Sequence, residues 1–475
     1  MCIRDSNRFL RFWPEINFDK IGFGILGCEK TVDSPPKWFP YIKGGTFRRW
    51  YPNKEYVVNY QNNGFEIKAA VMKKYPYLNN PDFVVKNTSA YFHAGITWSD
   101  VATGKFSARW VNDGYIFADA GPMLFVQDDP YVKMGYMNTP VFQMFCDLIC
   151  QGLHYSTGQI PQIPYLQNIE DKNFITASVD ENIQLSKEDW DSFETSWDFK
   201  KHPLLRNVST ISEAFNQWRT ECDDRFNQLK ANEEELNRIF IDIYGLQDEL
   251  TPEVEDKDVT VRKADLQRDI KSLLSYAVGC MFGRYSLDVE GLAYAGGEWD
   301  SSKYQSYIPD ADNVIPITDE EYLDDDIVSR LCAWLKAVYG ADTLEANLDY
   351  IAKALGNKGS TSREIIRNYF LNDFFKDHCQ TYSVTGSGKR PIYWLFDSGK
   401  QNGFKALVYL HRYTPDTIGN LRIDYLHKMQ RVYESEINRM QDMMDHSGNA
   451  REVAAASKRK DKLAKQLKEC REYDE

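Results

Sequence analysis

The chain has 475 residues, of which 43% are hydrophobic and 27% charged, and a formal net charge of −13. This length allows more than one domain with a substantial core, and the acidic balance argues against a uniformly basic protein that coats DNA. The nine cysteines form no Cys-x-x-Cys pair, and no apolar run reaches the roughly 20 residues of a membrane span, so we expect a cytoplasmic protein without disulfides.

Both ends of the chain resemble truncation points. Residues 1–6 show no structural pattern and read like the translation of a sequencing-adapter remnant. The charged helical pattern of 458–475 stops without a Gly or Pro terminator. We therefore expect an internal piece of a longer protein. The expected segments are a linker at 1–29, a β-rich domain at 30–165, a second linker at 166–208, a helical spacer at 209–295, an α-helical domain at 296–412 and a long, truncated helical segment at 413–475.

The segment 37–51 carries an uncommon mixture of residues. Its four cationic and six aromatic side chains lie on both sides of Gly44 and Gly45. Aromatic faces stack on unpaired bases, guanidinium groups bind phosphate or the guanine edge, and paired glycines let a backbone approach a ligand closely. The alternative is a polar loop over a core, in which the aromatic rings serve packing. The residue types alone leave both interpretations open.

Short β-rich runs separated by turn residues follow this segment. Asn-Gly or Asp-Gly between aromatic and β-branched runs is a hairpin signal. We therefore expect one hairpin between residues 56–60 and 65–67, and another between residues 106–110 and 115–117.

Helical patterns dominate the rest of the chain. Thr139 reads as the N-cap of a first helix, with Pro at the next position. From Thr210, apolar side chains recur every three or four residues in stripes at 211–243, 266–281 and 426–444, which we interpret as core seams. The last stripe indicates an antiparallel helical pair or coiled coil. The predicted fold class is α+β: a mixed, β-rich domain, followed by a mainly α-helical region with a long C-terminal helical hairpin.

Several short motifs imitate functional sites without completing one. Residues 22–27 match Gly-x-Gly-x-x-Gly, but no helix pattern follows them, and Ser-Pro-Pro at 34–36 lacks the aromatic residue of a base-clamping loop. Residues 386–389 have the wrong spacing for a phosphate loop, and the seven histidines are isolated. The acidic run Asp324–Asp326 is interpreted as solvated surface, because nothing nearby completes a cation site. We therefore assign no catalytic, cofactor-binding or metal-binding residue.

Longer stretches of the chain resemble one known family. The stretches begin at residues 37, 134, 189, 275 and 389, and they read KWFPYIKGGTFRRWYPNKEYVVNY, MGYMNTPVFQMFCDLICQGLHYSTGQIPQIPY, DWDSFETSWDFKKHPLL, SYAVGCMFGRYSLD and KRPIYWLFDSGK. In this order they resemble blocks of PglX-type adenine-specific DNA methyltransferases, the large modification enzymes of BREX phage-defence systems. The resemblance extends over nearly all of residues 7–475.

The resemblance implies a parent enzyme that transfers a methyl group from S-adenosylmethionine to the amino group of adenine in a specific DNA site. Residues 30–165 would be its DNA target-recognition domain, and the catalytic domain would be missing. We therefore expect this fragment to bind double-stranded DNA, to bind no cofactor and to have no methyltransferase activity of its own. Other phage-defence proteins are expected partners, and a membrane is not. The alternative is a stand-alone specificity subunit of a restriction-modification system.

Two family elements supply the expected DNA-binding residues. Their sequences are "KGG…RKW" and "GITW…GKFSxR" in the family. In the second element, hydroxyl groups would donate to phosphates and cationic groups would neutralise them. Which residues read bases and which position the backbone is left open. The expected DNA-binding residues are Lys43, Gly44, Gly45, Arg48, Arg49 and Trp50 in the first element, and Thr97, Trp98, Lys105, Ser107 and Arg109 in the second.

Overall fold

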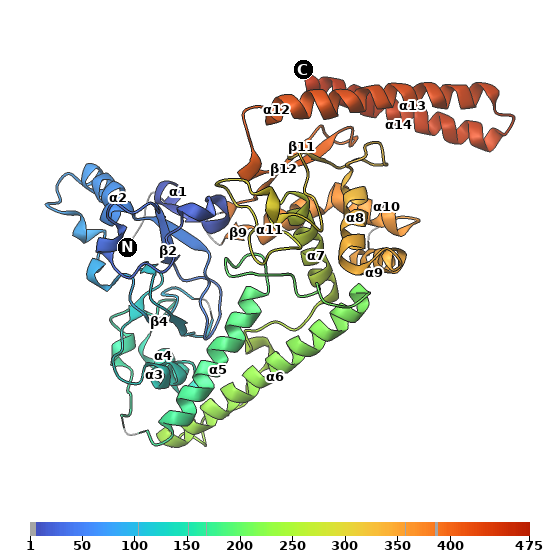
Figure 1. The fold of residues 1–475 in the computed structure, drawn as a ribbon. Helices are drawn as coiled ribbons and strands as arrows, with labels where there is room; N and C mark the ends of the chain where they lie inside the picture. The colour runs from blue at the N-terminus through green and yellow to red at the C-terminus, as the bar shows by residue number, and fades with distance from the viewer. Residues whose placement is uncertain (1–5, 103, 151, 168, 357, 385–387) are drawn as a thin grey trace. The chain divides into compact units, whose positions relative to one another are not determined.

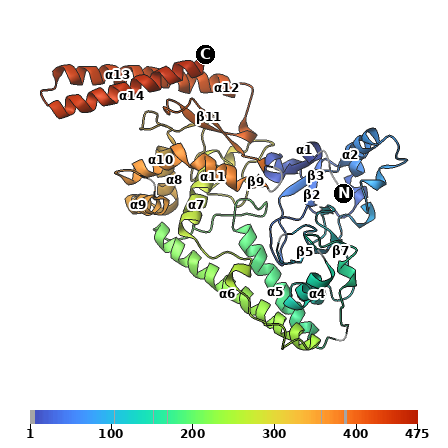
Figure 2. The ribbon, with the colours of Figure 1, turned by 180° about the vertical axis from the view of Figure 1, so that it is seen from behind.

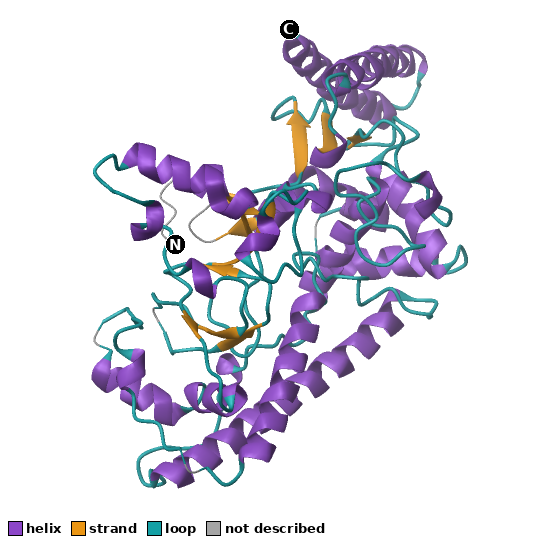
Figure 3. Cartoon of the chain, turned by 60° about the vertical axis from the view of Figure 1, so that its left-hand side comes forward, coloured by secondary structure: helices purple, strands orange, loops and turns teal. Residues whose placement is uncertain are grey.

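The computed structural model describes residues 6–102, 104–150, 152–167, 169–356, 358–384 and 388–475, so most of the expected adapter remnant lies outside the described residues. As predicted, the fold class is α+β, with small sheets among many helices (Figure 3). The chain divides into two compact units. Unit 1 comprises Met1–Lys200, Gln217–Ala264 and Val384–Gly388, and unit 2 comprises Lys201–Asn216, Asp265–Ser383 and Lys389–Glu475.

Unit 1 contains two small sheets. The first has the strand order β1 (Leu10–Phe12), β3 (Tyr56–Asn59), β2 (Trp38–Ile42) and β6 (Ile116–Phe117), in which β3 is antiparallel to both neighbours and β6 is parallel to β2. The second is antiparallel, in the order β5 (Arg109–Val111), β4 (Gly95–Thr97) and β7 (Met123–Leu124). Aromatic and β-branched residues favour these strands because both faces are largely buried.

Both hairpins predicted from the sequence are wrong. The Asn-Asn-Gly after β3 does adopt left-handed backbone conformations, with φ between 51° and 70°, but it forms a kink inside helix α2 (Gln61–Lys74), and the chain continues as helix instead of a strand. Ile67 and Val71 are one helical turn apart and form the buried face of α2, and strong helix formers surround them. The turn at Gly114 joins β5 to β6, but these strands belong to different sheets, because β5 pairs with β4 and β6 pairs with β2.

Unit 1 also contains several helices. They are α1 (Ser6–Phe9), α2, α3 (Pro130–Met137), α4 (Pro140–Ile149), α5 (Lys172–Asp191) and the part of α6 (Ile211–Tyr244) that begins at Gln217. The predicted N-cap is confirmed, since Thr139 Oγ1 accepts a hydrogen bond from the Phe142 amide. Apolar side chains of α3 to α6 and of β4 form one buried cluster. Figure 2 shows the ribbon of α4 next to that of α5. Two segments expected as linkers contribute structure: β1 lies within 1–29, and α5 lies within 166–208.

Unit 2 combines a group of helices with a three-stranded sheet. The predicted stripe at 266–281 is confirmed as helix α7 (Leu266–Met281), whose apolar face is buried. The other helices of the group are α8 (Ile327–Tyr339), α9 (Leu344–Leu355), α10 (Ser362–Asn372) and α11 (Phe374–Thr381). The antiparallel sheet has the order β11 (Tyr393–Asp397), β12 (Lys405–Tyr409) and β8 (Ile315–Pro316). Short strands β9 (Ser383–Val384) and β10 (Gly388–Lys389), whose residues are divided between the two units, form a separate two-stranded sheet.

The predicted C-terminal helical hairpin is confirmed. After α12 (Thr417–Asn420) and a π-helical segment at Leu421–Leu426, helices α13 (His427–His446) and α14 (Ala450–Asp474) lie side by side (Figure 1). Asn449 caps α14 through a hydrogen bond from the Arg451 amide. The apolar stripe of α13 packs with residues of α14 and with β12 in one buried cluster, which includes Met429, Tyr433 and Leu463.

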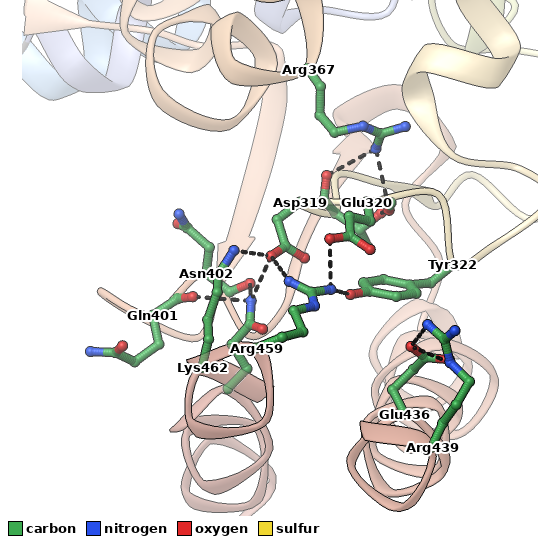
Figure 4. A network of polar contacts seen from close by, with 12 residues as sticks. Asp319, Glu320, Tyr322, Arg367, Gln401, Asn402, Glu436, Arg439, Arg459 and Lys462 are labelled. Atoms are coloured by element: carbon green, nitrogen blue, oxygen red, sulfur yellow. Dashed lines mark hydrogen bonds and ion pairs between the residues drawn. The ribbon is translucent and has the colours of Figure 1, made fainter. Parts of the chain in front are cut away.

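Polar contacts attach α14 to the segment that follows β8 (Figure 4). Arg459 pairs with Glu320 at 2.8 Å and with Asp319 at 3.5 Å, and it hydrogen-bonds to Tyr322. Lys462 also pairs with Asp319 at 2.5 Å. Helix α14 is therefore held in unit 2 by charge as well as by its apolar face.

The acidic run expected as surface is only partly exposed. Asp324 is exposed, but Asp326 is fully buried and caps α8 by accepting hydrogen bonds from the amides of Val328 and Ser329. The sequence pattern missed this because a capping carboxylate looks like any other acidic residue in a charged run. Among the described residues, no group of His, Cys, Asp or Glu is arranged to hold a metal ion, and no helix is long and apolar enough to cross a membrane.

Candidate nucleic-acid interface

The Gly-Gly of the first element follows directly after β2. Gly44 has a φ of 85°, and a Cβ atom there would lie 2.6 Å from the backbone oxygen of Ala120. Gly45 exchanges hydrogen bonds of 3.2 Å with the Ser99 hydroxyl, through its amide and its carbonyl. The half-buried ammonium group of Lys43 lies 4.8 Å from the ring centre of Tyr56, and burial lowers its pKa. Both glycines are thus required by backbone conformation and close approach.

Arg48 points into unit 1 toward helix α5. Its guanidinium group donates to Asp189 Oδ2 at 3.3 Å and lies 4.9 Å from the ring centre of Trp190. Arg262 reaches the same carboxylate from the backbone amide at 3.0 Å and from its side chain at 3.1 Å. Burial by itself raises the pKa of Asp189, but Arg262 and Arg48 outweigh it, so that the net shift of this pKa is downward. Asp189 therefore remains ionised inside unit 1.

Arg49 and Trp50 converge on a single carboxylate of helix α6. Arg49 Nη1 donates to Glu233 Oε2 at 2.7 Å, and Trp50 Nε1 donates to Glu233 Oε1 at 2.6 Å. Glu233 is 2% exposed. Burial raises its pKa, and the two donors oppose that shift. Because both carboxylate oxygens are occupied by these donors, Glu233 fixes the position of the Arg-Trp pair relative to α6.

The packing interpretation of segment 37–51 accounts for Arg48, Arg49 and Trp50. All three side chains are buried, and their polar groups face carboxylates of α5 and α6. The expected contact of these three residues with DNA remains a prediction. In the structure, they connect the segment after β2 to helices α5 and α6.

The second element is buried along β4 and partly exposed near Lys105. Thr97 Oγ1 donates to the Pro122 carbonyl at 2.8 Å, and Trp98 Nε1 donates to the Tyr155 carbonyl at 2.7 Å. Lys105 is exposed and pairs with Asp258 at 2.6 Å. The polar groups of Thr97 and Trp98 are therefore used internally, whereas the ammonium group of Lys105 is open to solvent.

Arg109 is a fully buried cation at the start of β5. Its Nη2 donates to Ser99 Oγ at 2.8 Å. Burial lowers its pKa to about 10, and repulsion from Arg48 adds to this shift. The Nε atom of Arg109 has no hydrogen-bond partner among the described residues. Arg109 therefore remains charged at neutral pH, inside unit 1 and beside the Ser99 hydroxyl.

The structure brings parts of both elements together around one pocket, which we call the Ser107 pocket. It has a volume of about 270 Å³. Its lining residues come from the segment after Gly44, from the loop between β4 and β5, and from the segment after α4. They are Gly45, Thr46, Phe47, Ser99, Val101, Ala102, Gly104, Lys105, Phe106, Ser107 and Tyr155. A second pocket of about 410 Å³ in unit 1 includes Arg49 and Lys105 but has a largely acidic rim, formed by Asp147, Glu249, Glu253, Glu255 and Asp258.

The residues that hold the first element were not found from the sequence. Glu233 lies in the apolar stripe of α6, four residues after Leu229 and three before Leu236. A charged residue at a stripe position indicates a buried polar contact, so this signal was available. Asp189 and Ser99 had no comparable signal, because their partners lie about 140 and 54 residues away in the chain.

Lys54, also missed, is a buried lysine in an aromatic environment. Its ammonium group lies 4.4 Å from the ring centre of Tyr51 and 5.0 Å from that of Tyr115. Burial lowers the pKa of Lys54 from 10.5 to about 8. The charged form is therefore disfavoured in the folded chain, and cation–π contacts offset part of the cost.

Replacing Lys54 by Met is expected to stabilise unit 1 by roughly 2 kcal/mol at neutral pH. Between pH 8 and 10.5 the unfolded chain binds more protons than the folded chain at this site, so the lysine's contribution to stability rises with pH across this window. The advantage of Lys54→Met should thus shrink as pH rises. Urea unfolding at several pH values tests this, with the exposed Lys73→Met as control. A pH-independent difference would contradict the assignment.

Comparison with known proteins relates the whole chain to one class of proteins. No protein-family model matches the chain. The chain is 43% identical over 486 aligned residues to the adenine-specific methyltransferase PglX of Lacticaseibacillus casei strain Zhang, a match that covers 100% of the chain and 39% of that relative. It is 33% identical over 499 aligned residues to the adenine-specific methyltransferase BrxX of Escherichia coli O9:H4 strain HS, covering 98% of the chain and 39% of the relative.

Both relatives are adenine-specific methyltransferases by name, which defines the class of protein to which the chain is related. Within that class, the chain matches PglX-type proteins over its whole length, as the resemblance of its sequence blocks predicted. It spans about two fifths of the length of these relatives.

Proposed function

We propose that this chain is the DNA-recognition portion of a site-specific adenine DNA methyltransferase that acts in the cytoplasm in phage defence. The observation that carries the proposal is the similarity of the whole chain to two adenine-specific methyltransferases. The Ser107 pocket adds support, because it joins the exposed Lys105 to the backbone of the Gly-Gly turn in unit 1. A groove that combines a cation, hydroxyl groups and open backbone suits contacts with DNA phosphates.

Methyl transfer itself is assigned to other parts of the parent enzyme. The chain has no Asn-Pro-Pro-Tyr sequence, and its Gly-x-Gly-x-x-Gly at 22–27 is followed by a short 3-10 turn at Cys28–Thr31 instead of a helix. S-adenosylmethionine is the cofactor of the parent enzyme in this proposal, and the chain binds none. Double-stranded DNA is the proposed partner, together with other phage-defence proteins.

Duplex binding by the purified chain is expected to fall steeply as salt rises from about 50 to 200 mM, because each neutralised phosphate releases counterions. Gel-shift titration at several salt concentrations measures this. A radiolabelled methyl-transfer assay with the same duplex should give no turnover above background. Binding that is absent at low salt would contradict the recognition role, and turnover would contradict the assignment of catalysis to other parts of the enzyme.

A further inference from the structure

The Ser107 pocket contains polar groups that the described structure leaves unused. Ser107 is 7% exposed, and no hydrogen bond of its hydroxyl to another described residue is found. Space is open at Gly104, where a Cβ atom would meet nothing within 4 Å. Because Ser107 Oγ is not among the buried atoms left without a partner, solvent reaches this hydroxyl from the pocket, and a ligand oxygen can replace that water. The pocket therefore contains a polar group that is ready for a ligand.

A buried positive charge lies directly behind this pocket. The guanidinium group of Arg109 donates to Ser99, which lines the pocket, and its Nε atom lacks a partner among the described residues. Neighbouring Arg48 has Asp189 as its counter-ion, but no described carboxylate pairs with Arg109. A buried cation without an anion is costly. An anionic ligand in the pocket would reduce that cost by attraction over a short distance in a poorly hydrated setting.

The polar groups of the lining suit a phosphate group, and its most deeply placed ring is not available for stacking. Phe106 is 4% exposed, and its ring packs against Phe142 and Tyr155 at centroid distances of 4.9 and 5.1 Å. The face of Phe106 is thus occupied, and Phe47, which is 38% exposed, is the aromatic ring of the lining that stays open to solvent. Lys105, although paired with Asp258, is exposed at the rim and carries the charge that a phosphate needs.

We propose that the Ser107 pocket receives one phosphate group of the DNA backbone, with Ser107 as hydrogen-bond donor, Lys105 as counter-ion at the rim and Arg109 as the buried charge behind Ser99. This inference rests on the proposed DNA-recognition function and names one contact within it. The contact positions the backbone and carries no base information. It assigns to Ser107 a direct role, and to Arg109 an electrostatic role exerted through the pocket wall.

Three variants test the pocket in the full chain. Ser107→Ala removes the donor and keeps the volume, Ser107→Asp places a negative charge in the pocket, and Ser89→Asp adds the same charge at an exposed position elsewhere in unit 1. Duplex binding is measured by gel shift across salt concentrations. Inorganic phosphate, added alone and followed by phosphorus NMR line width, separates a site for free phosphate from one for the DNA backbone. Thermal unfolding verifies that each variant is folded.

Ser107→Ala is expected to weaken duplex binding about tenfold for every DNA sequence alike, as the loss of one charge-assisted hydrogen bond implies. Ser107→Asp should weaken it further and reduce the slope of log affinity against log salt by about 1. Ser89→Asp should change neither. If Ser107→Asp does not fold, the binding measured for Ser107→Ala decides whether the pocket holds a phosphate group.

Unchanged binding by Ser107→Ala, with the wild-type chain still binding duplex, would overturn the pocket assignment and leave the proposed function standing. Line broadening of inorganic phosphate that Ser107→Ala abolishes, without any effect on duplex binding, would overturn the assignment to the DNA backbone. Absence of duplex binding by the wild-type chain would overturn the proposed function instead.

Discussion

Replacing Glu233 by Ala is expected to lower the free energy of unfolding of unit 1 by about 3–5 kcal/mol, the range typical for removing one partner of a buried ion pair. The variant leaves the guanidinium of Arg49 and the indole N–H of Trp50 without their acceptor at buried positions. Glu233→Gln should cost less, because its amide oxygen still accepts one of the two hydrogen bonds. Urea unfolding followed by tryptophan fluorescence measures both losses.

A neighbouring residue provides the control for Glu233. Glu235 lies on the same helix and pairs with Arg238 at the surface, so Glu235→Ala should change stability by about 0.5 kcal/mol or less. A double variant with Arg49→Met should lose less than the sum of the two single losses, because no buried charge is then left unpaired. Equal effects of Glu233→Ala and Glu235→Ala would show that the Arg49 and Trp50 contacts do not hold unit 1 together.

Asp326 is expected to contribute about as much to the stability of unit 2 as Glu233 contributes to that of unit 1. Its carboxylate forms a two-point ion pair with Arg367, at 2.6 and 2.8 Å. It also accepts hydrogen bonds from the Thr318 hydroxyl, at 3.1 Å, and from two amides at the start of α8. Asp326→Ala should therefore cost about 4 kcal/mol, from an unpaired buried guanidinium together with a lost helix cap. Differential scanning calorimetry of the full chain should show a lowered transition for unit 2.

The acidic run itself supplies the matched control. Asp324 is exposed, so Asp324→Ala should shift the transition by little. The shift caused by Asp326→Asn should lie between those caused by Asp324→Ala and Asp326→Ala. An asparagine still caps the helix but cannot neutralise Arg367. If the Asp324 and Asp326 variants unfold alike, Asp326 is solvated and the run is ordinary surface, as the charge pattern alone suggested.

Local patterns in the sequence predicted helices α4, α6, α7 and α13. The stripes that became α6, α7 and α13 have the period of a helix, and Thr139 followed by Pro is an N-terminal signal that depends on adjacent residues only. The hairpins failed because Asn-Gly and Asp-Gly predict a left-handed turn, which formed, but not the partner of the strand that follows. That partner is chosen by packing between distant residues.

The sequence by itself determined the resemblance to PglX-type methyltransferases, the α+β class and the helices with long apolar stripes, because these depend on neighbouring residues or on whole blocks of sequence. Only the tertiary structure decided the roles of the charged residues. Arg48 and Arg49 have the same side chain as any phosphate-binding arginine, but carboxylates about 140 and 184 residues further along the chain take their guanidinium groups. Burial and partners are properties of the folded chain, so residue type alone could not separate these anchors from Lys105 and Ser107, which line an open pocket.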